Sequence, residues 1–423
     1  MTLTAPRSLK LPSAPLTAVG MVLSELLLAV VIGFGLLLLG ADGTSWILGG
    51  IAAGAIVFRV SCTYLQIEAT PNRTARKIGQ LLVGLTVGFS VQHSDVGAIA
   101  GQIPIFALLT GCLLLGSLGV AAIYTRLQQT DWLTAMLATT PGNIGVMASI
   151  AADYGSNPAL VSLVQLVRFT AVTSAIPLLA HISHAANAWE TLYQLTHPLV
   201  STDLGYLLQL GVVLMLASFS VRLGERLKLP VPGLMCPLAV GVGFNALMSA
   251  VPVLPSVEFH PPALLNLLGQ ILLGTTIGEY WGKNPNLGRF AIARAALPAA
   301  LTLLVGVGTA GIAKLFTAWD WLTCLLVTAP GGSPEMIWIA LTLNQDVELV
   351  TAGHLVRLIA LNALLPVLVS ISAQLEQASS QQRQATATAQ VDWISKFRAL
   401  PGKAESRNGC ISPINELSED RLC

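Results

Sequence analysis

Charged side chains are scarce in this chain. Only 10% of its 423 residues are Asp, Glu, Lys or Arg, whereas 54% are hydrophobic. A water-soluble protein of this length could not cover its surface with so few charges, so lipid is the expected solvent for most of the chain. The formal net charge is +1. This balance excludes the strongly basic surface that proteins use to bind nucleic acid.

Cysteine and histidine are also few, and neither is clustered. The six cysteines stand singly, and no pair has the CxxC spacing of a metal site. His181 and His184 form an HxxH pair, which supplies too few ligands for a stable metal site. The sequence therefore predicts no disulfide framework, no metal and no cofactor. No small-residue cleavage site follows the first apolar run, so we expect that run to be retained.

What the chain does contain is a set of long apolar runs separated by short polar loops. Most of these runs approach or exceed the length of roughly 17–25 residues that a helix needs to cross a bilayer. Two shorter, Gly-rich runs carry the spacing of small residues that lets membrane helices approach closely. The expected spans are 19–40, 45–65, 77–92, 99–125, 159–180, 204–221, 231–250, 262–281, 290–313 and 349–372.

One segment of the chain occurs twice. Residues 131–177 and 320–366 align without a gap at a separation of 189 positions, and 18 of the 47 aligned residues are identical. A second match, GQLLVGLTVG at 79–88 against GQILLGTTIG at 269–278, fits with a separation of 190 positions. Most of the chain is therefore a duplication. A Pro-Gly pair inside apolar sequence and an arginine within a membrane span occur in both copies.

The Pro-Gly pairs predict a break in each copy. Proline removes a backbone donor and clashes with the preceding turn, so 131–155 and 320–345 are not expected to form continuous helices. Each segment is either one broken spanning helix or a re-entrant hairpin that returns to its starting side.

Loop charges favour the hairpin. Lys and Arg concentrate near the N-terminus and at 59–77, 222–228, 283–294 and after 383, while the loops at 41–44, 93–98, 181–203 and 251–262 contain none. The positive-inside rule then places both termini in the cytoplasm and 181–203 outside only if each Pro-Gly segment returns. Each half contributes five crossings, an odd number, so the two halves have opposite orientation.

The predicted fold is thus an all-α polytopic membrane protein, with about ten transmembrane helices and two re-entrant Pro-Gly hairpins in inverted repeats. The expected organisation is 1–18 cytoplasmic segment, 19–183 first membrane repeat, 184–203 external linker, 204–373 second membrane repeat and 374–423 disordered cytoplasmic tail.

Two hairpins that enter from opposite faces bring their tips together near the bilayer midplane. Irregular backbone at that depth is tolerated where it lines a cavity or is buried in protein. The helices after the tips would point amide-rich N-termini at that cavity, with Asn143 and Ser333 as their caps. The candidate substrate-binding residues are Pro141, Gly142, Asn143, Arg168, Pro330, Gly331, Gly332, Ser333, Glu335 and Arg357.

Several of these residues have a second interpretation. Arg168 and Arg357 suit anion binding, but they could equally clamp hairpin carbonyls. Glu335 is either a proton-coupling carboxylate or a group that only satisfies the dipole at a helix start. Asp131 and Asp320, which open the two segments, are better explained as helix caps than as ligands.

The second copy carries a recognisable pattern. APGGSPEM at 329–336, the stretch containing Asp346, and HLVRL at 354–358 resemble the signature of the AbrB family of bacterial membrane proteins. The resemblance covers about residues 20–372. The first copy departs from the pattern, because PGNIGVM lacks the second glycine and the glutamate. The resemblance implies a polytopic inner-membrane protein with a repeated domain, and family members carry labels of gene regulation and of ammonia monooxygenase.

The function that fits these features is secondary transport of a small polar or anionic solute by alternating access. The alternative is a membrane-embedded regulator or sensor that affects gene expression. An oxidative enzyme is not expected, because dispersed histidines do not form a copper site. The expected partners are the lipid membrane and an unknown small solute, without nucleic acid, and a homo-oligomer is compatible with the sequence.

Overall fold

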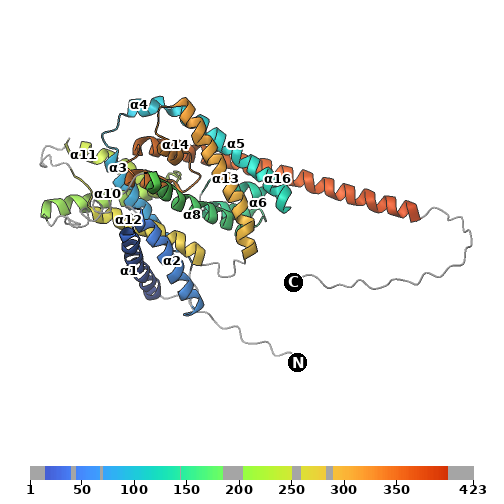
Figure 1. The fold of residues 1–423 in the computed structure, drawn as a ribbon, viewed down its shortest axis with the longest axis horizontal. Helices are drawn as coiled ribbons and strands as arrows, with labels where there is room; N and C mark the ends of the chain where they lie inside the picture. The colour runs from blue at the N-terminus through green and yellow to red at the C-terminus, as the bar shows by residue number, and fades with distance from the viewer. Residues whose placement is uncertain are drawn as a thin grey trace, which may run out of the picture. The chain divides into compact units, whose positions relative to one another are not determined.

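Helix is the only regular secondary structure in the described part of the chain in the computed structural model (Figure 1). The structure describes residues 15–39, 44–66, 70–142, 144–183, 203–249, 259–282 and 289–398. The helices of the first half are α1 Pro15–Leu38, α2 Ser45–Thr63, α3 Arg73–Ser90, α4 Val96–Gly101, α5 Ile103–Gln128, α6 Trp132–Thr139, α7 Ile144–Asp153 and α8 Pro158–Ser183. Those of the second half are α10 Leu204–Arg226, α11 Pro232–Ser249, α12 Ala263–Gly282, α13 Arg289–Phe316, α14 Trp321–Thr328, α15 Ser333–Thr342 and α16 Val347–Arg398.

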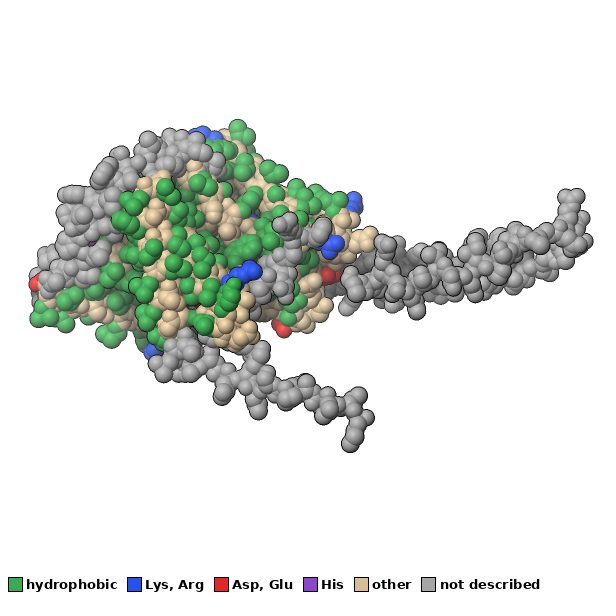
Figure 2. All heavy atoms as spheres, turned by 60° about the horizontal axis from the view of Figure 1, so that its bottom comes forward, with side chains coloured by type: hydrophobic (Ala, Val, Ile, Leu, Met, Phe, Trp, Pro, Cys, Tyr) green, Lys and Arg blue, Asp and Glu red, His purple; other side chains and the backbone are tan. Residues whose placement is uncertain are grey.

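Seven of the described helices are long and apolar enough to cross a membrane: α1, α2, α5, α8, α10, α13 and α16. Their outer faces carry large hydrophobic side chains, such as Leu115 on α5 and Met215 on α10, that are more than half exposed. Figure 2 shows one face covered largely by hydrophobic side chains, with few charged ones among them. Such a surface is stable in lipid rather than in water, so the chain is a helical membrane protein.

The three remaining expected spans are helices as well. They correspond to α3, α11 and α12, which are shorter or contain more polar residues than the other seven. The sequence did not predict α4, the short helix that precedes α5. Asp95 caps its first turn by accepting hydrogen bonds from Gly97 N and Ala98 N.

Glycines let two helix pairs approach until their backbones touch. Gly274 and Gly278 of α12 lie against the backbone of α2, next to Ile47 and Ile51. In the other half, Gly84 and Gly88 of α3 lie in the same way against α11. The small-residue spacing predicted close helix approach, and the structure confirms it in both halves.

Side-chain contacts show which segments lie together at each end of the helices. At one end Lys77 Nζ lies 2.6 Å from Glu225 Oε1, which joins the basic segments 73–77 and 222–228. At the other end Asn245 Nδ2 donates to Gln92 Oε1 at 2.9 Å. Asn245 Nδ2 also donates to Phe259 O at 3.1 Å. The segments that meet at the second end lack Lys and Arg.

The chain divides into two compact units, residues 1–373 and 374–423. The predicted boundary of the tail falls at the same place. The prediction of a disordered tail differs from the structure over 374–398, where α16 continues to Arg398. This stretch is rich in Gln and Ala, which favour helix. Residues 399–423 lie outside the described residues, as do 1–14 and most of the linker 184–203.

Candidate functional site

Both Pro-Gly segments fold as two short helices that meet at a break. In the first copy α6 ends at Thr139, and α7 begins at Ile144. The loop after α7 returns to the start of α6. There Ser156 Oγ donates to Asp131 Oδ2 at 2.9 Å, and Asn157 N donates to Thr134 Oγ1 at 3.0 Å. The first segment is therefore a hairpin of two helices rather than one bent helix.

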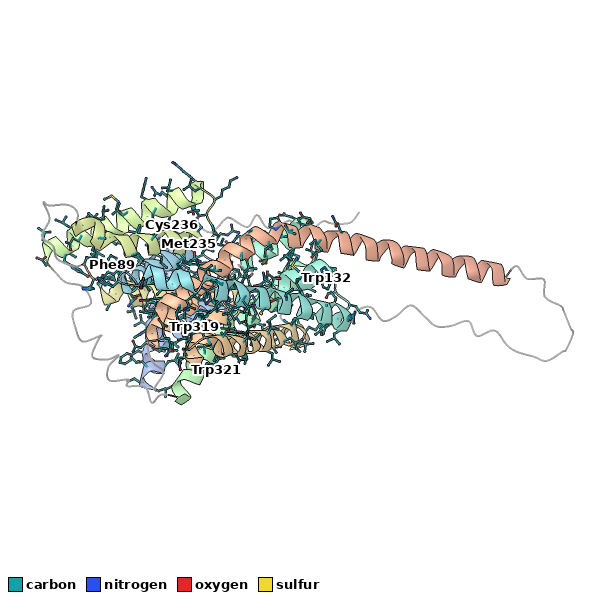
Figure 3. All side chains as sticks on the ribbon, turned by 90° about the horizontal axis from the view of Figure 1, so that it is seen from above. Phe89, Trp132, Met235, Cys236, Trp319 and Trp321 are labelled. Carbon is teal, nitrogen blue, oxygen red and sulfur yellow. The ribbon has the colours of Figure 1, made fainter. Side chains whose placement is uncertain are left out.

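The second copy returns in the same manner. Thr323 near the start of α14 hydrogen-bonds with Gln345 after the end of α15, at 3.2 Å. Figure 3 shows Trp132 and Trp321, the first residues of α6 and α14, well apart in the view. The open ends of the two hairpins therefore lie at different places in the molecule.

Aspartates cap the first helix of each hairpin. Asp131 accepts a hydrogen bond from Thr134 N, and Asp320 accepts one from Leu322 N. The interpretation of these two residues as helix caps is confirmed. The prediction that Ser333 caps α15 is wrong, because Gly332 occupies the cap position and provides no side chain. Asn143, the cap predicted for α7, lies outside the described residues.

A threonine at each break ties the hairpin to the helix before it. Thr139 Oγ1 donates to Ser117 O of α5 at 3.0 Å. Thr328 Oγ1 donates to Gly306 O of α13 at 3.1 Å. Donors and acceptors in the two copies are each 189 positions apart, so the duplication preserved the whole contact. This bond fixes the first half-helix against the preceding span.

The arginine ties the first hairpin to the helix that follows it. Arg168 Nη1 donates to Thr139 O at 2.8 Å, and Arg168 Nη2 donates to Gln165 Oε1 at 2.8 Å. Gln165 Nε2 donates in turn to Leu137 O and Thr140 O, at 2.8 and 2.9 Å. These carbonyls end a helix and lack partners within it. The guanidinium therefore neutralises the negative end of α6.

His354 and Arg357 hold the end of α14 in the second copy as Gln165 and Arg168 hold the end of α6 in the first. We call each of these two sets of contacts an arginine clamp. Arg357 Nη1 donates to Ala329 O at 2.7 Å. His354 Nε2 lies 2.9 Å from Leu326 O, so this nitrogen carries the hydrogen and donates it. The other ring nitrogen, Nδ1, then accepts from Arg357 Nη2 at 2.6 Å. His354 thus replaces Gln165 in both of its roles, as donor to a carbonyl and acceptor from the arginine.

These contacts bear on the two interpretations of the arginines. Arg168 and Arg357 are 2% and 3% exposed, and in each of them Nη1 and Nη2 form the hydrogen bonds of the arginine clamp. Arg168 Nε is fully buried and has no hydrogen-bond partner. The geometry favours a clamping and positioning role, and the ligand role stays a prediction.

The tip of the second hairpin is closely packed. Pro330 and Ser333 are buried, and Gly331 and Gly332 are half-buried. A Cβ on Gly332 would overlap Glu335 Oε2 and the ring of Phe169. Ser333 Oγ lies 3.2 Å from His354 Nδ1, so it belongs to the arginine clamp rather than to a cap.

Glu335 is 3% exposed and lies in the first turn of α15. Its carboxylate accepts a hydrogen bond from its own backbone amide and interacts electrostatically with Arg76 of α3. The helix-dipole interpretation is therefore consistent with its position. Val146, its counterpart in the first copy, is 48% exposed and offers no charge.

The two tips approach each other around Phe169. In the first hairpin Pro141 is buried and Gly142 is exposed. Ile144, the first residue of α7, belongs to a buried cluster with Phe169 of α8. The same Phe169 ring abuts Gly332 of the second tip. Arg168 and Arg357 are also close enough to interact electrostatically. The starts of α7 and α15 therefore share one environment.

Sequence reasoning missed one acidic residue. Glu279 of α12 is buried beside Glu25 of α1, and the two carboxyl groups are hydrogen-bonded. Nothing local marks Glu279 in the sequence, and only the repeat alignment could have pointed to it. Phe89 occupies the equivalent position in the first copy, so only the second copy has an acidic residue there.

Comparisons with known proteins place the chain in a family. A family sequence model described as "Transition state regulatory protein AbrB" matches residues 46–373. YhjN of Bacillus subtilis (strain 168) is 27% identical over 347 residues, which covers 79% of this chain and 88% of YhjN. AbrB of Escherichia coli (strain K12), named as a proposed regulator, is 27% identical over 321 residues, covering 74% and 86%. These matches span both repeats and confirm the resemblance: the chain belongs to the AbrB family.

Proposed function

We propose that the protein is a secondary transporter of a small polar or anionic solute that works by alternating access. The observation that supports this best is the pair of clamped hairpins whose tips meet around Phe169. Discontinuous helices in the two halves of a repeat commonly form the solute site of transporters. In this proposal the solute binds between the starts of α7 and α15.

The unequal tips suggest how the solute is oriented. At the second tip Glu335 already accepts a hydrogen bond from an amide at the start of α15. At the first tip no carboxylate follows the break, so the amides of α7 are available to a negative group. An anionic group of the solute therefore binds at the first tip, and a neutral or positive part faces Glu335.

Alternating access requires the two repeats to be inverted in the membrane. The proposed arrangement has ten crossings, two re-entrant hairpins and both termini in the cytoplasm, in an inner membrane. The separation of a basic end, joined by Lys77 and Glu225, from an end without Lys or Arg supports it.

Cysteine labelling tests this arrangement. We expect Asp153→Cys, at the open end of the first hairpin, to react with a membrane-impermeant thiol reagent only after the membrane is permeabilised. Ala318→Cys, at the open end of the second hairpin, is expected to react in intact cells. Both residues are exposed, and the substitutions are made in a variant without the native cysteines. Labelling of both positions from the same side would contradict the inverted arrangement.

Transport itself is tested by an untargeted mass-spectrometric comparison of solutes in cells with and without the protein. We expect at least one polar solute to differ, and Gly332→Ala to abolish the difference. The added methyl group overlaps Glu335 and Phe169 and displaces the second tip. The matched control is Gly311→Ala on α13, where nothing lies within 4 Å of the new Cβ.

The control also separates transport from folding. Both variants are first checked for membrane insertion and for a single peak in size-exclusion chromatography. A solute difference that persists unchanged in well-inserted Gly332→Ala would remove the second tip from the transport site.

A regulatory role is the second candidate. It rests on the name of the Escherichia coli relative and on the separate unit at 374–423, which a cytosolic partner could bind. Deleting the residues after 375 distinguishes the two functions. Regulation predicts loss of a gene-expression phenotype with unchanged solute levels, whereas transport predicts that solute levels depend on the hairpins.

A further inference from the structure

Two acidic side chains are buried against each other where α1 packs on α12. Glu25 and Glu279 are each 1% exposed, and a hydrogen bond joins their carboxyl groups. An ionised carboxylate can only accept hydrogen bonds, so one member of such a pair must carry a proton. The pair therefore holds at least one proton between two carboxyl groups.

The carboxyl oxygens of the pair form few hydrogen bonds to other groups. Asn72 N donates to Glu279 Oε2 at 2.5 Å. Glu25 Oε1 is fully buried and has no hydrogen-bond partner. Two adjacent buried carboxyl groups cannot both ionise without a large cost, so the shared proton is what stabilises this arrangement.

In the described part of the chain, the basic side chains of the neighbouring helices are exposed or have other partners. Glu25 and Glu279 are the only charged residues of α1 and α12. Nearby, Arg59 and Arg73 are exposed, and Lys77 pairs with Glu225. The other titratable residues on α2, α3 and the end of α12 are Cys62, Arg76 and Tyr280. Arg76 interacts with Glu335, and Tyr280 packs against the cluster that contains Ile144 and Phe169.

The repeat shows that packing alone does not require these carboxyl groups. Phe89 occupies the position of Glu279 in the first half. Its ring packs against those of Phe244 and Phe259, with centroids 5.9 and 5.3 Å apart. An apolar contact fills the equivalent place, so the buried acid pair is a specific departure from the repeat.

One helical turn connects the pair to the second hairpin. Glu279 holds the backbone amide of Asn72, which caps α3. Arg76 N donates to Asn72 O at 3.2 Å, so Arg76 lies one turn further along α3. Arg76 then interacts with Glu335 at the tip of the second hairpin. A shift of Asn72 would therefore move the charge that faces Glu335.

We propose that Glu25 and Glu279 form a proton-binding site that couples proton movement to the motion of the second hairpin. The coupling in this inference rests on the proposed transport function, whereas the proton site does not. In the protonated state the two carboxyl groups share the proton, and α1 and α12 stay in contact. Release of the proton to water leaves two carboxylates, whose repulsion separates Glu25 from Glu279 and loosens the hold on Asn72.

Infrared spectroscopy of the purified full-length protein in lipid nanodiscs tests the proton site. We expect the wild type to show a carbonyl band of a buried carboxylic acid that disappears as the pH is raised. Glu25→Gln and Glu279→Gln should each lose this band, because glutamine cannot bind the proton. The control is Glu225→Gln, at a surface residue paired with Lys77, which should keep the band.

The coupling is tested in vesicles that contain a trapped pH-sensitive dye. Proton entry that depends on the protein is expected for the wild type and lost in both glutamine variants. Glu25→Asp and Glu279→Asp keep a carboxyl group and are expected to shift the band, which keeps the test valid if a glutamine variant does not fold.

An infrared band that both glutamine variants retain would overturn the proton site. A band removed by sodium at constant pH would also overturn it, since a metal cation would then occupy the pair. If the band behaves as expected but no transported solute is found, the proton site stands and the transport function fails. If a solute is transported but the glutamine variants keep the band, the transport function stands and the proton site fails.

Discussion

Arg357→Ala is expected to destabilise the protein by about 3 kcal/mol or more, because a buried charged donor is removed from its partners. Ala329 O loses its donor, and His354 Nδ1 loses the charged donor that holds its ring. The second hairpin is then released from α16. Thermal unfolding of the purified protein in detergent, monitored by the amount of soluble monodisperse protein, measures the effect.

Matched variants separate the clamp from other causes. Arg357→Lys is expected to lose most of the stability, because an ammonium group cannot reach both acceptors as the planar guanidinium does. His354→Gln is expected to have little effect, since Gln165 performs the same role in the first copy. Arg168→Ala should resemble Arg357→Ala.

The opposite result would restore the ligand interpretation. If Arg357→Ala and Arg168→Ala insert and melt as the wild type does, but no longer alter cellular solute levels, the arginines bind solute rather than hold the hairpins.

Gly278→Ala is expected to destabilise the protein by about 3 kcal/mol, near the upper end of the usual cost of overpacking. The added Cβ would overlap the backbone oxygen of Ile51 and the amide nitrogen of Ala55 on α2. Backbone atoms cannot rotate away as a flexible side chain can, so α2 and α12 must separate. The same melting assay measures this loss.

The control is Gly308→Ala on α13, where nothing lies within 4 Å of the new Cβ. Alanine favours helix over glycine by up to about 1 kcal/mol, so this variant should melt at the same temperature or higher. Equal melting of Gly278→Ala and Gly308→Ala would show that the α2–α12 contact tolerates a methyl group and is less close than the structure has it.

Much of the fold is encoded in local patterns. Apolar run length predicted a helix at each expected span, and the Pro-Gly pairs predicted both breaks. Asp131 and Asp320 could be identified as caps because a cap acts on amides two or three residues away. The glycine spacing indicated close helix packing without saying which helix is the partner.

Local patterns failed where the partner is distant. Ser333 looks like a cap beside Pro334, but its hydroxyl lies next to His354 on another helix. Gln165 and His354 occupy the same position of the repeat and differ in chemistry. The structure shows that both side chains donate to a carbonyl and accept from an arginine, so a chemical difference in sequence leaves the contact unchanged.

The sequence alone therefore determined a duplicated helical membrane protein with one broken segment and one buried arginine in each half. Those features follow from hydrophobicity, proline geometry and charge, which act within a few residues. Only the tertiary structure decided that the arginines hold the ends of α6 and α14, and that Glu25 meets Glu279. A carboxyl group in a span carries no local sign of its partner, because the partner is chosen by how α1 and α12 pack.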